Sequence, residues 1–66
     1  MSVAKVIEIS AESTKSFEDA IRDGIDTAAE TVNNIRGAWV KEQQVMVKEG
    51  KIVGYRVDLK VTFVLK

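Results

Sequence analysis

The sequence predicts an α+β domain of the order β-α-β-β, in which a three-stranded antiparallel sheet is partly wrapped around one helix. Three observations predict it. Residues 53–65 alternate between apolar and polar side chains, which is typical of a strand with one buried face. Residues 16–34 repeat apolar side chains at spacings of three and four, as an amphipathic helix does. Two further β-rich stretches, 3–9 and 35–47, flank that helix.

The length of 66 residues bounds the chain to a single domain, residues 1–66. A domain of this size buries only about 60% of the surface of its unfolded chain, so it is marginally stable unless a disulfide, a structural metal or oligomerisation stabilises it. The chain has no cysteine for a disulfide or a thiolate metal site, and no histidine, the commonest transition-metal ligand. Oligomerisation is the remaining route to stability.

The ten basic and ten acidic residues cancel and are interspersed. Nucleic-acid-binding proteins normally carry a basic surplus or stripe, so we expect no nucleic-acid partner. No apolar run approaches the roughly 18 residues that cross a bilayer, and the N-terminus lacks the apolar core of a signal peptide. We therefore expect a soluble, cytoplasmic protein without a membrane partner.

The first strand is expected at residues 3–9, followed by a polar loop at 10–15. Ser16 is the expected N-cap of the helix, and Asp19 completes a variant capping box. The helix is expected to end at residues 33–34, which makes it about 25 Å long.

One face of this helix is apolar and the other is charged. The apolar stripe comprises Phe17, Ala20, Ile21, Gly24, Ile25, Ala28 and Val32. Gly24 costs about 1 kcal/mol in a helix relative to alanine, and close approach to the sheet would offset that cost. The carboxylates of the other face, Asp19, Asp23, Asp26 and Glu30, are most simply a solvated surface. A calcium or magnesium site would need oxygen ligands from several subunits, so the sequence leaves any metal site unknown.

The second strand, residues 35–47, has apolar side chains in both alternating registers, so we expect a bend, a bulge, or apolar contacts on both faces. Residues 48–50 form the expected hairpin turn, with Gly50 at positive φ. The last strand, residues 51–65, is about fifteen residues long against the usual five or six. It has more backbone edge than this small chain can cover, which indicates an assembly.

Several segments together resemble the dodecin family. They are Ile35-Arg-Gly-Ala-Trp-Val-Lys-Glu-Gln, Gly50-Lys-Ile-Val-Gly-Tyr-Arg-Val-Asp-Leu-Lys-Val-Thr-Phe, the opening Val-Ala-Lys-Val-Ile-Glu-Ile and the helix start at Ser16-Phe17. The similarity covers nearly the whole chain without a gap. It implies β-α-β-β subunits that form a hollow homododecamer. It also implies non-catalytic binding of riboflavin or FMN, as stacked pairs at subunit interfaces, for storage or sequestration.

The resemblance also implies which residues would contact a flavin. The tryptophan that stacks on the ring in flavin-binding dodecins is replaced here by Gly37, and the glutamine that hydrogen-bonds the pyrimidine edge is replaced by Arg56. Trp39 projects from the same face as Gly37 on a regular strand and is the expected substitute platform. Arg56 can still donate to flavin carbonyl oxygens, and Gln44 matches a family position near the flavin phosphate or ring rim. The expected flavin-binding residues are Gly37, Trp39, Gln44 and Arg56.

Each of these residues also has a structural interpretation. Trp39 would be an interface or core aromatic, and Gln44 a solvated strand residue. Arg56 would form a salt bridge with Asp58 or Glu42. The alternative function is a dodecameric shell without a flavin role, which binds ions or another small anionic ligand. Nothing in the sequence places an activated acid or base beside a nucleophile, so we expect a binding protein and not an enzyme.

Overall fold

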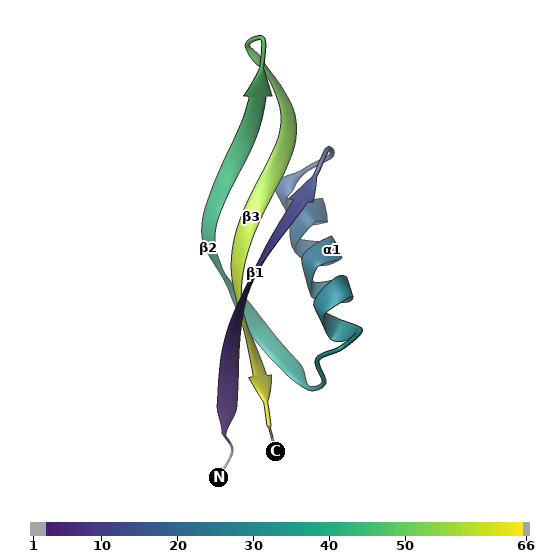
Figure 1. Ribbon diagram of the computed structural model, residues 1–66, viewed down its shortest axis with the longest axis vertical. Helices are drawn as coiled ribbons and strands as arrows, with labels where there is room; N and C mark the ends of the chain where they lie inside the picture. Colours follow the sequence, from purple (N-terminus) through teal and green to yellow (C-terminus); the bar gives the residue numbers. More distant parts are fainter. Residues whose placement is uncertain (1–2, 66) are drawn as a thin grey trace.

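The computed structural model describes residues 3–65 and confirms the order β-α-β-β. The elements are β1 (Ala4–Ser13), α1 (Phe17–Ala29), β2 (Ile35–Lys48) and β3 (Lys51–Val64). The strands form one antiparallel sheet in the order β1-β3-β2, with α1 on one face (Figure 1). The β2–β3 hairpin extends beyond α1, and the start of β1 and the end of β3 lie together at the opposite end of the molecule.

The central strand β3 carries the core. Its side chains Val57, Leu59 and Val61 are buried, with at most 1% of their surface exposed, and they pack with Ala20 of α1. The predicted buried face is therefore confirmed for the middle of this strand, whereas Val53 and Leu65 at the two ends of the alternating stretch are exposed by 49% and 56%. Both of its edges are paired, one by β1 and the other by β2, so the uncovered backbone edge that we expected on the last strand lies on the outer edges of β1 and β2 instead.

β1 is longer than predicted. We expected a loop from residue 10, whereas the strand continues to Ser13, which pairs with Tyr55 of β3. Ala11 lies opposite the buried Val57 and is itself half-buried. The polar character of residues 10–13 concealed this continuation, because pairing with β3 and not apolar content extends the strand.

Ser16 caps α1 as predicted. Its hydroxyl oxygen accepts a hydrogen bond from the backbone N–H of Asp19 at 2.9 Å. The second half of the expected capping box is replaced, because the Asp19 carboxylate instead accepts from the hydroxyl of Ser13 at 2.7 Å. The cap is thus tied to the end of β1.

α1 ends at Ala29, earlier than the predicted end at residues 33–34. Its 13 residues make a helix of about 20 Å. Residues 31–34 are threonine, valine and two asparagines, which are weaker helix formers than the alanines before them. Asn34 adopts a φ of 64°, which takes the chain out of the helical direction and into β2.

The helix approaches the sheet closely at Gly24, as predicted. Gly24 is buried, and a Cβ atom added there would lie 3.0 Å from Cβ of Ala11 and 3.4 Å from Cδ1 of Leu59. This spacing leaves no room for a side chain between α1 and the sheet. The close contact explains why a glycine is present in the middle of the helix.

β2 is irregular, also as predicted. Its register against β3 shifts at three places, between Ile35 and Gly37, between Val40 and Glu42, and between Met46 and Val47. The turn that follows has positive φ at Glu49 (52°) and Gly50 (77°), the combination found in type I′ hairpins. Gly50 therefore has the predicted conformation, and Glu49 shares it.

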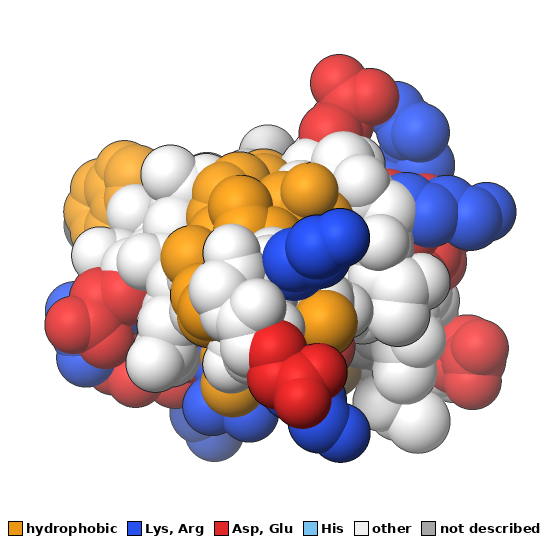
Figure 2. All heavy atoms as spheres, turned by 90° about the horizontal axis from the view of Figure 1, so that it is seen from above, with side chains coloured by type: hydrophobic (Ala, Val, Ile, Leu, Met, Phe, Trp, Pro, Cys, Tyr) orange, Lys and Arg blue, Asp and Glu red, His pale blue; other side chains and the backbone are white. Residues whose placement is uncertain are grey.

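β2 is exposed along almost its whole length. Trp39 and Val47 are exposed by 69% and 60%. At the hairpin end, Ile52 and Val53 of β3 are exposed as well. Figure 2 looks down on this end and shows uncovered hydrophobic side chains. Among the described residues, no helix is long and apolar enough to cross a membrane.

Substitution of Gly24 by valine should destabilise the fold by about 1–3 kcal/mol, because the new side chain would overlap Ala11 and Leu59. Urea unfolding at a fixed protein concentration measures the change. Asp26→Val on the exposed side of the same helix is the matched control and should stay within about 1 kcal/mol of the wild type. Equal stability of the Gly24→Val and Asp26→Val proteins would contradict the close packing.

Candidate functional site

The candidate site lies on the face of the sheet that is turned away from α1. Because Val57, Leu59 and Val61 face the helix, the residues between them project from the other side. We call this side the polar face. Its residues include Val6, Glu8, Ser10 and Glu12 of β1, Arg56, Asp58, Lys60 and Thr62 of β3, and Gly37, Trp39, Glu42 and Gln44 of β2.

The structure places all four expected flavin-binding residues on the polar face. Gly37 pairs with Thr62, and Trp39 pairs with Lys60, so Gly37 and Trp39 share a face as expected. Gln44 lies directly opposite Arg56. Their role in flavin binding stays a prediction.

These residues form two separate groups within one chain. The partners of Trp39 and Gln44 on β3 are four residues apart, which is about 14 Å along a strand. Trp39 therefore stands at one place on the polar face, and Gln44 with Arg56 at another. A site that uses both groups at contact distance would combine residues from neighbouring subunits.

Arg56 makes a salt bridge, but with a different partner from the ones predicted. Its Nε and Nη2 atoms both donate to Oε1 of Glu12, at 2.9 and 2.7 Å. We expected Asp58 or Glu42 as the partner. Glu12 was missed because it lies in the segment predicted to be a loop, whereas the extension of β1 brings it directly opposite Arg56.

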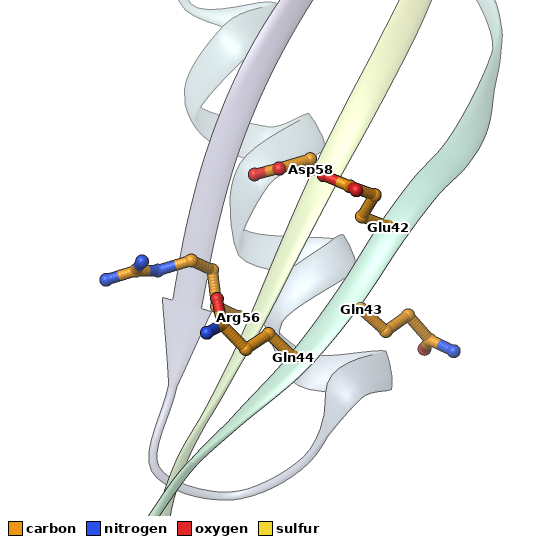
Figure 3. Close-up of a pocket in the computed structure, with 5 residues that line it drawn as sticks. All are labelled: Glu42, Gln43, Gln44, Arg56 and Asp58. Atoms are coloured by element: carbon orange, nitrogen blue, oxygen red, sulfur yellow. The ribbon is translucent and has the colours of Figure 1, made fainter.

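Two carboxylates, Glu42 and Asp58, face each other across β2 and β3. Opposite residues of an antiparallel pair have Cβ atoms about 5 Å apart, and like charges at such positions are destabilising. With Gln43, Gln44 and Arg56 they line an open pocket of about 470 Å³. In Figure 3, Glu42 and Asp58 lie next to each other over β3, while Gln43 points away from the other four residues.

Sequence reasoning did not anticipate this facing pair. The turn pairs Lys48 with Lys51 and Val47 with Ile52, and the same register continued along the strands would place Asp58 opposite Lys41. The irregularity between Met46 and Val47 shifts the register by one residue, and as a result Glu42 instead of Lys41 lies opposite Asp58. The second shift, between Val40 and Glu42, restores the first register at Val40, which pairs with Leu59.

A second ion pair crosses the polar face. Nζ of Lys41 lies 3.4 Å from both carboxylate oxygens of Glu8. Lys41 and Arg56 are thus each directed to a β1 carboxylate. Neither of these cations forms an ion pair with Glu42 or Asp58 among the described residues.

A family model for dodecins matches residues 3–66. The chain belongs to the dodecin family. The resemblance inferred from the sequence is therefore confirmed, and with it the fold of the chain.

Three matches to two relatives illustrate the similarity. A calcium dodecin from Mycobacterium tuberculosis is 38% identical over 66 residues, covering 100% of this chain and 93% of the relative. The solved dodecin from Streptomyces davaonensis matches with a TM-score of 0.92 at 31% identity, covering 98% and 96% of the two chains. A crystal structure of the calcium dodecin from M. tuberculosis, described as having a novel calcium-binding site, matches with a TM-score of 0.83 at 40% identity. The match covers 97% of the present chain and 91% of the M. tuberculosis chain.

Four of the five residues that line the pocket carry oxygen atoms of the kind that a hard cation binds, and the fifth is Arg56. Carboxylate and amide oxygens such as those of Glu42, Asp58 and Gln44 are the ligands that calcium prefers, although calcium takes six to eight of them. Residues 3–65 hold no cluster of three or more histidine, cysteine or acidic residues that could bind a metal alone. The remaining ligands would have to be water molecules or groups of neighbouring subunits. For a flavin, the exposed Trp39 fits a stacking role, whereas two of the five N–H donors of Arg56 are directed to Glu12.

Replacement of Glu42 by glutamine should stabilise the metal-free dodecin by about 0.2–1 kcal/mol, because it removes the like charge opposite Asp58. Urea unfolding in the presence of a chelator, at a fixed protein concentration, measures the difference. Glu49→Gln in the turn also removes one negative charge but has no facing carboxylate, and it should leave the stability nearly unchanged. A loss of stability in Glu42→Gln would show that the two carboxylates do not repel each other.

Proposed function

We propose that this dodecin is a non-catalytic binding protein that works as a homododecamer and holds calcium on the polar face of its sheet. The observation that carries the proposal is the facing pair of Glu42 and Asp58. A bound divalent cation would convert their repulsion into two favourable contacts, which gives a physical reason for a like-charge pair at this position. Gln44 adds a neutral oxygen in the same pocket.

The relatives support calcium as the ligand. Two comparisons match calcium dodecin of M. tuberculosis, at 38% and 40% identity, over nearly the full length of this chain. The replacement of both ring-binding side chains of flavin-binding dodecins, by Gly37 and Arg56, points in the same direction. The sequence analysis gave an ion-binding dodecameric shell as the alternative to flavin binding. Calcium binding is one form of that alternative.

The exposed surface of β2 supports the assembly. A subunit with principal extents of 51 × 19 × 13 Å is thin, and its apolar residues on β2 and at the hairpin end are uncovered. Burial of such surface yields about 25 cal/mol per Å² and is the main driving force for association. The assembly would also supply calcium ligands that one chain lacks.

Storage or sequestration of a flavin, riboflavin or FMN, is the second candidate. A specific observation favours it: Trp39, the one tryptophan, is exposed by 69% on the face that carries Gly37. Such an indole can stack on an aromatic ring. This function would need Trp39 and the Gln44–Arg56 group to meet across a subunit interface.

Calcium binding is tested by isothermal titration calorimetry of the metal-free assembly, after light scattering has established its mass. Asp58→Asn and Glu42→Gln should each weaken calcium binding at least about tenfold, because each removes one charged oxygen ligand. Glu18→Gln, which lies on α1 behind the sheet, is the matched control and should bind like the wild type. Wild-type affinity in both polar-face variants, or no calcium binding by an intact wild-type dodecamer, would refute the proposal.

The flavin candidate predicts saturable quenching of riboflavin or FMN fluorescence by the wild-type assembly. Trp39→Ala should then weaken flavin binding by about 1–3 kcal/mol through loss of stacking, while Trp39→Phe should keep most of the affinity. Arg56→Gln should improve flavin binding if the arginine only replaces the glutamine of flavin-binding dodecins. A flat titration with an intact dodecamer would exclude flavin as the ligand.

A further inference from the structure

Arg56 is a cation placed next to the proposed calcium ligands. It lies two residues before Asp58 on the same face of β3, and directly opposite Gln44. Neighbouring side chains on one face of a strand are about 7 Å apart at Cα, which is within reach of a guanidinium group. Arg56 could therefore neutralise Asp58 and Glu42 and compete with a metal ion for them.

The observed contacts hold Arg56 away from those carboxylates. Nε and Nη2 donate to Glu12 on β1, at 2.9 and 2.7 Å, and both bonds go to the same oxygen. Figure 3 shows the guanidinium extended toward β1, on the side away from Glu42. The side chains are 40% and 56% exposed, so the pair is of the solvent-accessible kind that contributes modestly and can be exchanged for another partner.

We infer that Glu12 is a positioning residue for the cation site: it engages Arg56 and thereby keeps Glu42 and Asp58 available to calcium. The inference rests on the proposed calcium function. It also explains how an arginine is tolerated beside a cation site, because Glu12 offsets its charge and fixes its direction.

If Glu12 did not bind Arg56, the guanidinium group could turn toward Asp58 and Glu42. Without the Glu12 carboxylate, the acidic partners that remain within reach of Arg56 on the polar face are Asp58 and Glu42, which form the next residue pair along the strands. A guanidinium group binds carboxylates through paired N–H donors, which would occupy the oxygens needed by a metal ion. Calcium would then have to displace Arg56 before it binds.

A double-mutant cycle tests this role, with calcium affinity of the intact assembly measured by calorimetry. Glu12→Gln should raise the calcium Kd about threefold, the size expected for competition by an exposed ion pair. In the Arg56→Gln background, Glu12→Gln should change the Kd by less than about 1.5-fold, because no guanidinium is left to compete. Glu12→Asp keeps the charge but shortens the reach, and it should weaken binding in the same direction as Glu12→Gln.

The cycle separates positioning from simple electrostatics. If Glu12 acted only through its negative charge, Glu12→Gln would weaken calcium binding equally with and without Arg56, and Glu12→Asp would have no effect. Either result in a protein that binds calcium would overturn this inference alone. Absence of calcium binding by the wild type would overturn the proposed function and the inference together. Glu18→Gln, whose carboxylate pairs with Arg22 on the helix, is the control for loss of a surface ion pair.

A spectroscopic measurement reports the same contact without calcium. The Nε–H proton of Arg56 should exchange with solvent more slowly than that of Arg22 in the metal-free wild type, because it donates to Glu12 at 2.9 Å. Glu12→Gln should accelerate this exchange. Equal exchange in the wild type and the variant would show that Glu12 does not hold the guanidinium.

Discussion

The central strand β3 is hydrogen-bonded along both edges and packed against α1 on one face, and the rest of the subunit depends on this arrangement. β3 has 14 residues and extends for about 48 Å, whereas the 13 residues of α1 reach only about 20 Å. The helix can therefore cover less than half of the sheet. Gly24 brings it as close as the backbone permits, so that Val57, Leu59 and Val61 are fully buried under a single helix.

The same arrangement leaves two surfaces that one chain cannot cover. One is β2 with the hairpin end, where apolar side chains are open to solvent. The other is the polar face, where basic and acidic side chains of three strands lie next to one another. The chain is thin and has no cysteine or histidine with which a disulfide or a zinc-type site could stabilise it. These properties are consistent with an assembly that buries the apolar surface of β2 and completes sites on the polar face.

Electrostatics on the polar face follow from the pairing register. Arg56 and Lys41 are both directed to β1, to Glu12 and Glu8, and Glu42 is left facing Asp58. A bulge that shifts the register by a single residue decides this outcome, because it exchanges a lysine for a glutamate opposite Asp58. The location of charge on this face is thus a consequence of strand pairing.

The sequence by itself determined the order of the elements, the Ser16 cap, the glycine turn and the buried face of β3, because each depends on side chains close together in the chain. It also indicated that Gly37 and Trp39 share a face. Only the tertiary structure decided the extension of β1 to Ser13, the register of β2 and the pairing of Glu42 with Asp58. Glu12 and Arg56 are 44 residues apart in the chain and meet because β1 lies beside β3. Bulges and long-range pairs depend on the balance of all contacts between strands, and local patterns do not encode that balance.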